Sequence, residues 1–279
     1  MQASDKVVEG INMQQLYFKG KTYQGLEEVV SPADGGLMAF KLLKLGAGGD
    51  YEALSGEYEI ALVILSGSAH VTVDGEVFSG LGERRDVFSG RAATAYIPRD
   101  SQFRVEAAAG EVEAALCLVK ADKQYPAFVV KPEEVMINHR GGQSWKRDVH
   151  DIIVENGEGR VDRIVLGETY SAPGNWSSFP PHKHDRSIPA EETELAEIYH
   201  FRIKPEEGFA VQVMYSEDRE IDEAFLIRDK DSINIPKGYH PVVAPPSVKA
   251  YYLWFLAGEK GRVLQPYDDP TFKALKALE

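Results

Sequence analysis

Pro180-Pro181-His182-Lys183-His184-Asp185 leads, through a polar loop, into the apolar run Leu195-Ala196-Glu197-Ile198-Tyr199-His200-Phe201. A short apolar run of this kind is typical of a buried β-strand. Comparable runs, separated by Gly, Pro, Asp and Ser, recur at residues 37–45, 59–65, 70–73, 93–97, 102–107, 112–120, 149–154, 163–169, 195–203, 209–215, 224–228, 232–235 and 248–256. Stretches with helical periodicity are scarce, so the sequence predicts an all-β protein.

One short helix is expected at the end of the chain. Asp269 followed by Pro270 is a suitable pair for an N-cap and a first helical turn. Phe272, Leu275 and Leu278 then repeat at helical spacing, which predicts one apolar stripe facing the rest of the protein.

The two halves of the chain resemble each other. Ile97-Pro98 matches Ile235-Pro236, and Glu59-Ile60 matches Glu197-Ile198, both at an offset of 138 residues. A shared offset over two separated strands favours duplication over chance similarity between β segments. The polar stretch 138–144 contains a Gly pair and is the expected junction. We therefore expect two tandem β modules, residues 1–140 and 141–279.

Composition and charge limit the partners and the location of the protein. The net charge is −13, and such a negative field repels nucleic acid and anionic membranes, so neither is an expected partner. The single cysteine, Cys117, lies in an apolar run and has no partner for an internal disulfide. The chain start lacks a secretory signal, and no apolar stretch approaches the roughly 20 residues of a membrane span. These features predict a soluble protein of the cytoplasm with a buried thiol.

Four residues form a candidate metal site. In an extended segment His182 and His184 point to the same side, so that both imidazoles can bind one ion. Glu197 lies in an apolar strand, where a carboxylate needs a partner. His240 follows a Pro and a Gly that bend the chain between two strands and can turn its imidazole inward. Three imidazoles and one carboxylate suit Zn, Mn, Fe, Ni or Co, with coordination positions left for a substrate.

The order of these motifs resembles the metal-binding motifs of the cupin superfamily of small β-barrels. The gap before the glutamate is longer than in cupins, so Glu191, Glu192 or Glu194 is an alternative ligand. Glu197 is favoured because the other three lie in a polar loop. In the first half no His-x-His precedes Glu59, so a metal-free, degenerate first module and a metal-binding second module are expected, both cupin-like barrels or jelly rolls.

Further segments are similar to one family, the 5-deoxy-glucuronate isomerases of bacterial inositol catabolism. They are the segments 167–169, 174–178, 180–185, 208–212 and 238–243. The resemblance is clearest over residues 161–258 and implies a chain of two cupin modules. It also implies an aldose-ketose isomerase that converts 5-deoxy-D-glucuronate to 5-dehydro-2-deoxy-D-gluconate.

A metal ion suits this reaction because it stabilises the negative charge that develops when a carbon-bound proton is removed. Glu197 and Tyr199, which share a strand face, are the candidate catalytic residues. The candidate substrate-binding residues are one amide and three cations close in sequence to the metal ligands: Gln212, Lys183, Arg186 and Lys237.

Two other functions fit the same ligand set. A cupin dioxygenase would use iron in this site, and a non-catalytic sugar-binding module would use the metal only to order the barrel. The expected partner is in each case a small organic acid or a sugar acid. A shared barrel edge would also allow a homodimer.

Overall fold

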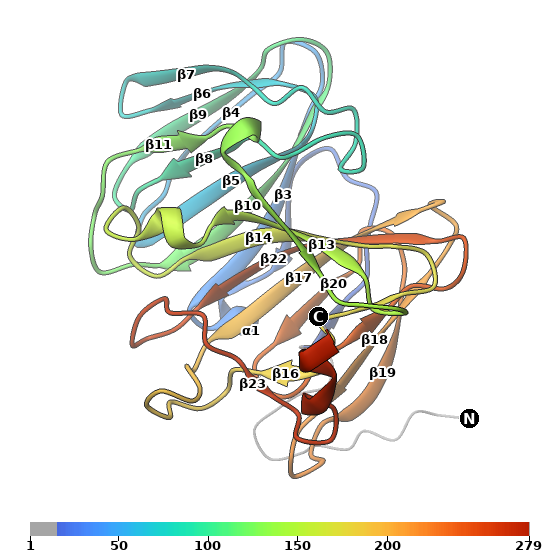
Figure 1. The fold of residues 1–279 in the computed structure, drawn as a ribbon. Coiled ribbons are helices and arrows are strands. Elements are labelled where there is room, and N and C mark those ends of the chain that lie inside the picture. Colours follow the sequence, from blue (N-terminus) through green and yellow to red (C-terminus); the bar gives the residue numbers. More distant parts are fainter. Residues whose placement is uncertain (1–15, 279) are drawn as a thin grey trace.

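The computed structural model describes residues 16–278, and its regular structure is almost entirely antiparallel β-sheet (Figure 1). This confirms the predicted all-β fold. The helical segments are short: α1 (Pro32–Gly35) and the 3₁₀ turns η2 (Pro132–Glu134), η3 (Glu155–Gly157) and η4 (Lys273–Leu278). Within the described residues, none of these helices has the length or hydropathy needed to cross a membrane.

The N-terminal module consists of two sheets. Its strands are β2 (Gly25–Val30), β3 (Met38–Leu45), β4 (Asp50–Leu54), β5 (Tyr58–Ser66), β6 (Ala69–Val73), β7 (Glu76–Leu81), β8 (Thr94–Ile97), β9 (Gln102–Ala107), β10 (Val112–Lys120) and β11 (Phe128–Val130). The larger sheet has the order β11-β8-β5-β10-β3-β2 and the smaller one the order β4-β9-β6-β7. Apolar side chains of both sheets, such as Leu62, Val71 and Phe103, form one buried cluster inside this module.

The C-terminal module has the same plan. Its strands are β12 (Met136–Arg140), β13 (Arg147–Ile153), β14 (Val165–Ser171), β15 (Trp176–Ser177), β16 (His182–Lys183), β17 (Ala196–Lys204), β18 (Ala210–Tyr215), β19 (Asp222–Ile227), β20 (Ser232–Ile235), β21 (Val242–Val243), β22 (Lys249–Ala257) and β23 (Tyr267–Asp268). Together with β1 (Tyr17–Phe18) they form sheets of order β1-β20-β17-β22-β14-β13-β12 and β15-β21-β18-β19, and the pair β16-β23.

The strand orders repeat between the modules. The order β8-β5-β10-β3-β2 corresponds to β20-β17-β22-β14-β13, and β4-β9-β6-β7 corresponds to β15-β21-β18-β19. The same topology in two consecutive halves is what a duplication produces. The pair β16-β23 has no equivalent among the described strands of the N-terminal module. The His-x-His segment therefore lies on a strand that the first module lacks.

The chain crosses from the N-terminal sheets to the C-terminal sheet close to the predicted boundary at residues 140 and 141. β12 ends at Arg140 but pairs with β13 in the C-terminal sheet. The Gly pair of the polar stretch makes the turn of this hairpin, where Gly141 adopts a φ of 81°. The crossing lies earlier, at residues 131–135, between β11 and β12. In addition, β1 pairs with β20, so both sequence halves contribute to the C-terminal sheet.

The outer faces of the two larger sheets pack against each other. Phe40, Val63 and Cys117 of the N-terminal sheet belong to the same buried cluster as Leu253 and Phe255 of the C-terminal sheet. The Phe40 and Phe255 ring centroids are 6.0 Å apart. Cys117 is fully buried, as predicted, and burial raises the pKa of its thiol. Because one apolar cluster spans both modules, the modules stabilise each other.

The end of the chain differs from the predicted helix. The last turns form the 3₁₀ segment η4 instead of an α-helix. Asp269 accepts a hydrogen bond from the Thr271 amide at 2.8 Å, and the Phe272 ring packs against Phe179 at 5.4 Å. The predicted Asp269 cap and the apolar contact of Phe272 are therefore present, but the helix is of the tighter 3₁₀ type and begins at Lys273.

Candidate metal centre

The two histidines of the His-x-His motif lie at the inserted strand β16, which β23 holds in place. His182 pairs with Asp268, and the Asp269 amide donates to the Pro181 carbonyl at 2.8 Å. Lys183 points away from both imidazoles, and its Nζ donates to Asp185 at 2.7 Å and to Glu192 at 2.9 Å. The alternation expected of an extended segment thus separates the imidazoles from the lysine.

His184, Glu197 and His240 form a buried cluster whose candidate ligand atoms lie within 4.8 Å of one another. Oε2 of Glu197 is 3.1 Å from Nε2 of His184 and 3.3 Å from Nε2 of His240. The contact with His240 lacks hydrogen-bond geometry, and Nε2 of His240 is buried without a hydrogen-bond partner. A buried, unpartnered imidazole nitrogen beside a carboxylate is what a metal site requires.

Backbone carbonyls orient two of the imidazoles. Nδ1 of His184 lies 2.7 Å from the Leu195 carbonyl, and Nδ1 of His240 lies 2.9 Å from the Gly238 carbonyl. Such contacts favour a proton on Nδ1 and turn Nε2 of both rings to the centre of the cluster, where Nε2 of His184 also contacts Oε2 of Glu197. A Cβ at Gly238 would lie 2.8 Å from the Tyr215 carbonyl oxygen, and φ is 92° there, so this turn requires glycine.

His182 lies beside this cluster but is not one of its three members. Its ring centroid lies 4.9 Å from that of His240 and 6.3 Å from that of His184. Burial lowers the pKa of both His182 and His240 to about 3, so both imidazoles are neutral near pH 7. Burial lowers the pKa of His184 as well, but the hydrogen bond and the charge of Glu197 raise it by more, so its net pKa lies above the usual value. Three imidazoles and one carboxylate fit a divalent transition metal, which would take the place of the proton that His184 shares with Glu197.

The alternative glutamates lie elsewhere. Glu192 is buried, but its carboxylate accepts from Lys183 and from the amides of Asp185 and Arg186. Glu191 and Glu194 are exposed. Glu197 is therefore the carboxylate that the fold brings to the histidines.

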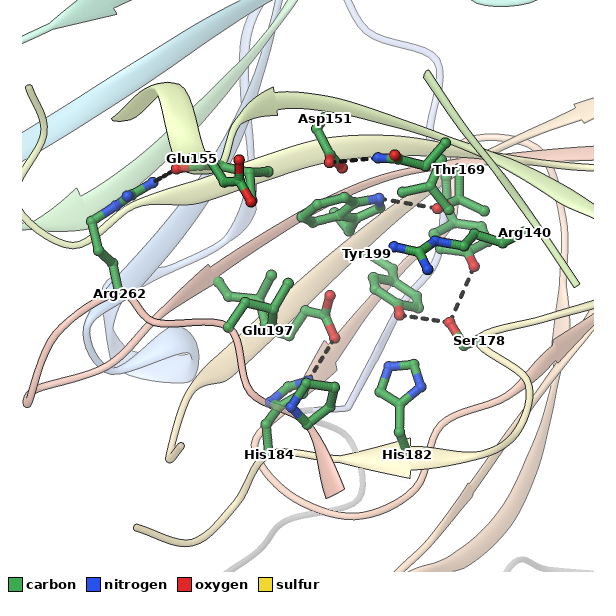
Figure 2. Close-up of a pocket in the computed structure, with 18 of the residues that line it drawn as sticks. Arg140, Asp151, Glu155, Thr169, Ser178, His182, His184, Glu197, Tyr199 and Arg262 are labelled. Atoms are coloured by element: carbon green, nitrogen blue, oxygen red, sulfur yellow. Dashed lines mark hydrogen bonds and ion pairs between the residues drawn. The ribbon is translucent and has the colours of Figure 1, made fainter. Parts of the chain in front are cut away.

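A cavity of about 560 Å³ opens beside three of these side chains, His182, His184 and Glu197 (Figure 2). Its apolar wall includes Val149, Trp254 and Leu256. The Trp254 indole donates to the Thr169 hydroxyl at 3.0 Å and lies over Gly167, where a Cβ would be 2.2 Å from the ring. The cavity has the size and the mixed lining of a small-molecule site.

Three hydroxyl groups, those of Ser178, Tyr199 and Tyr252, line the cavity next to the candidate metal centre, and we call them the hydroxyl row. The Ser178 hydroxyl lies 3.0 Å from the hydroxyl of Tyr199 and 3.1 Å from that of Tyr252 (Figure 2). The two tyrosine rings are stacked with centroids 4.5 Å apart. Burial, and next the charge of Glu197, raise the pKa of Tyr199 well above its usual value, so this hydroxyl keeps its proton near pH 7.

The lysines and the arginine proposed from sequence as substrate contacts do not line this cavity. Lys183 is buried in its ion pairs with Asp185 and Glu192. Arg186 pairs with Glu217 at 2.6 Å, and Lys237 pairs with Glu220 at 2.7 Å. Alternation and loop geometry place these three side chains outside the cavity lining.

Gln212 is likewise absent from the cavity lining, although it lies in the same barrel. Its side chain is fully buried on β18, and neither amide atom has a hydrogen-bond partner in the described part of the chain. It is an interior polar group of the barrel, separate from the residues that line the cavity.

Sequence reasoning missed the cations of the cavity, which are Arg140, Arg147 and Arg262. Arg140 and Arg147 lie on β12 and β13, at opposed positions of the hairpin, and Arg262 lies in the loop before β23. No local motif links them to the histidines. The glycine pair at residues 141 and 142 is a sequence signal for the β12–β13 hairpin, but only the folded sheet places this hairpin beside the metal centre.

Comparison with known proteins identifies the family. Residues 17–275 match the KduI/IolB family. A 5-deoxy-glucuronate isomerase of Geobacillus kaustophilus is 37% identical over 234 residues, which cover 84% of this chain and 83% of the relative. A protein of the same name from Bacillus subtilis strain 168 is 36% identical over 246 residues, covering 88% and 90%.

Solved structures agree with this comparison. An IolB-like protein from Salmonella typhimurium LT2 superposes with a TM-score of 0.87 at 30% identity, covering 93% of this chain and 98% of that one. Bacillus subtilis oxalate decarboxylase superposes with a TM-score of 0.60 at 12% identity, covering 91% and 79%, which supports the cupin fold alone. The fold, the buried His/Glu cluster and these matches lead to one conclusion: this chain belongs to the KduI/IolB family.

Proposed function

We propose that this protein is a metal-dependent aldose-ketose isomerase that converts 5-deoxy-D-glucuronate to 5-dehydro-2-deoxy-D-gluconate in inositol catabolism. The relatives that cover most of the chain carry the name 5-deoxy-glucuronate isomerase. The observation that supports this chemistry best is the cluster of His184, Glu197 and His240 beside the three contacting hydroxyls of Ser178, Tyr199 and Tyr252. The metal is a divalent ion of the Zn, Mn, Fe, Ni or Co group, held by these residues and His182.

A metal ion in this site would supply Lewis-acid stabilisation of the negative charge on two adjacent substrate oxygens. The protein supplies the proton transfers. Tyr199 keeps its phenolic proton and is positioned by Ser178, so it donates to the carbonyl oxygen and recovers a proton from the neighbouring hydroxyl. Glu197 contacts both imidazoles through Oε2, and its Oε1 is the candidate base that moves the carbon-bound proton between the two carbons.

The apolar wall of Val149, Trp254 and Leu256 limits water around the reacting carbons. Water exclusion strengthens the interactions of the oxygens with the surrounding dipoles and reduces exchange of the transferred proton. Glu197 and Tyr199 can then transfer protons between adjacent substrate atoms with only small movements of their side chains.

Proton NMR of the purified protein with 5-deoxy-D-glucuronate in D₂O tests this proposal. The protein is loaded with each candidate metal in turn, and a chelated sample runs alongside. We expect ketose formation that stops on chelation and returns when metal is added back. His184→Ala and Glu197→Gln should lose both metal and turnover, whereas His139→Ala, at an exposed histidine, should retain them.

Two results would reject the isomerase. One is a metal-loaded protein that binds the sugar acid without changing it, which would favour a binding module. The other is oxygen uptake by the iron-loaded protein with no ketose product, which would favour a dioxygenase. The first result is read by NMR and the second by an oxygen electrode in the same buffer.

A further inference from the structure

The cavity beside the metal centre contains one arginine whose guanidinium is not engaged by the fold. Arg262 donates to the carbonyls of Ile153, Val154 and Ile164, so its guanidinium is already bound. Arg147 donates to the Trp145 carbonyl. The Arg140 side chain makes no hydrogen bond or ion pair with any other residue in the range 16–278. Arg140 is therefore the cavity arginine whose whole guanidinium remains available to a ligand.

The position of Arg140 suits a ligand that also reaches the metal centre. Arg140 is the last residue of β12, and in Figure 2 its guanidinium points from this strand into the cavity, toward the side where Tyr199 and Ser178 lie. Its charge reaches Asp151 on β13, where it opposes the effect of burial on the pKa of that carboxyl. A molecule bound between Arg140 and the histidines would contact the hydroxyl row along its length.

The charge of the cavity makes such a cation necessary for an acidic substrate. Asp151, Glu155, Glu158 and Glu197 all line the cavity, and the whole protein has a net charge of −13. A carboxylate entering this field is repelled unless a positive group meets it. The planar fork of an arginine matches the two oxygens of a carboxylate and forms paired, charge-assisted hydrogen bonds.

We propose that Arg140 binds the carboxylate of the sugar acid while the opposite end of the substrate lies at the histidine cluster. This inference rests on the proposed function, because it assumes a substrate with a carboxylate at one end and a carbonyl at the other. Arg140 is a substrate-binding residue that sets the preference for sugar acids over neutral aldoses. It takes no part in the proton transfers.

A comparison of two substrates tests this assignment. The first is 5-deoxy-D-glucuronate and the second is its primary amide, which has the same shape without the charge. Removal of Arg140 by Arg140→Gln should lower kcat/KM for the acid by about 10- to 100-fold and leave kcat/KM for the amide within about 2-fold. Most of the loss should appear in KM, and Arg140→Lys should recover part of it.

Arg104→Gln is the matched control, since Arg104 is also exposed but pairs with Asp50 in the N-terminal module, outside the cavity. It should leave both substrates unaffected. Equal losses of Arg140→Gln on the acid and the amide, or no loss on either, would overturn the assignment. Melting temperatures of all variants show whether a loss comes from unfolding.

Failure of the proposed function is distinguishable from failure of this inference. A wild-type protein that turns over neither compound refutes the isomerase, and the Arg140 site is then measured by calorimetric titration with the same acid and amide. Weaker binding of the acid alone to Arg140→Gln supports the site, and unchanged binding of the acid refutes it. An active wild type whose preference for the acid survives Arg140→Gln refutes the inference and leaves the isomerase in place.

Discussion

Glu59 and Glu197 lie on corresponding strands of the two modules but point to opposite faces of their sheets. Glu197 faces the cavity of the C-terminal barrel with Tyr199. Glu59 faces the other module and accepts hydrogen bonds from the amides of Asp162, Arg163 and Ile164. In the N-terminal strand it is Ile60 that joins the cluster inside the barrel. A shift of one residue in a strand exchanges its two faces.

Because the two glutamates face different surroundings, replacing each with glutamine should affect different properties: stability at position 59 and metal binding at position 197. Glu59→Gln should destabilise the fold by about 2 kcal/mol, because a charged acceptor of three amides and the Tyr96 hydroxyl is replaced by an amide. Its metal content should remain normal. Glu197→Gln should lose metal with a smaller change in stability. Urea unfolding and metal analysis of the two proteins measure both quantities, and metal loss in Glu59→Gln would contradict the assignment of faces.

The hydroxyl row predicts a kinetic effect without a structural one. Tyr199→Phe removes the hydroxyl that lies 3.0 Å from Ser178 but keeps the ring stacked on Tyr252. We expect kcat to fall by about 100-fold or more, as for the loss of a proton donor, with little change in KM. Steady-state kinetics on the metal-loaded enzyme provide the measurement. Tyr51→Phe, in the N-terminal module, is the control, and a KM effect alone would argue against proton transfer by Tyr199.

The buried ion pair between the modules predicts a large loss of stability. Arg84 and Glu168 lie 2.6 Å apart with side chains that are 1% and 0% exposed. Arg84→Met leaves a buried carboxylate without its cation and should cost about 3–5 kcal/mol. Adding Glu168→Gln should recover part of that loss, since the uncompensated charge is gone. Chemical denaturation of the single and double variants measures both effects, and additive losses would contradict this explanation.

A second pair between the modules predicts acid sensitivity. Burial raises the pKa of Glu113, but Arg202, 2.6 Å away, and the Tyr23 hydroxyl lower it by more, so the net pKa lies below its usual value. The charged form therefore stabilises the fold above the unfolded-state pKa, and this contribution is lost as pH falls through the folded-state pKa.

Glu113→Gln should accordingly reduce stability at neutral pH and flatten its decline in acid. Unfolding midpoints in urea at about pH 7 and about pH 3 measure the change. Glu111→Gln is the control, because Glu111 is 56% exposed in its pair with Lys44. A decline in acid as steep as that of the wild type would contradict the role of Glu113.

Local patterns predicted the strands and the histidine and glutamate cluster, because alternation along a strand is a local property. The contacts of Lys183 and Arg186 were not predictable in this way, since Glu192 and Glu217 reach them only in the folded loops. Arg140 carries no local signal, and the β12–β13 hairpin places it at the cavity. The repeat was detectable in the sequence at an offset of 138 residues. The one-residue difference in strand pairing between the two modules, which turns Glu59 and Glu197 to opposite faces, was not.

The pairing of β1 with β20 has a consequence for synthesis on the ribosome. Tyr17, at the start of β1, donates its hydroxyl to Asp231, 214 residues further along the chain, beside β20. Domains generally fold as they emerge, beginning with the N-terminal one. β1 therefore waits until β20 has been synthesised before it gains its neighbour. Truncated nascent chains should hold an assembled first module with Tyr17 still accessible to proteases.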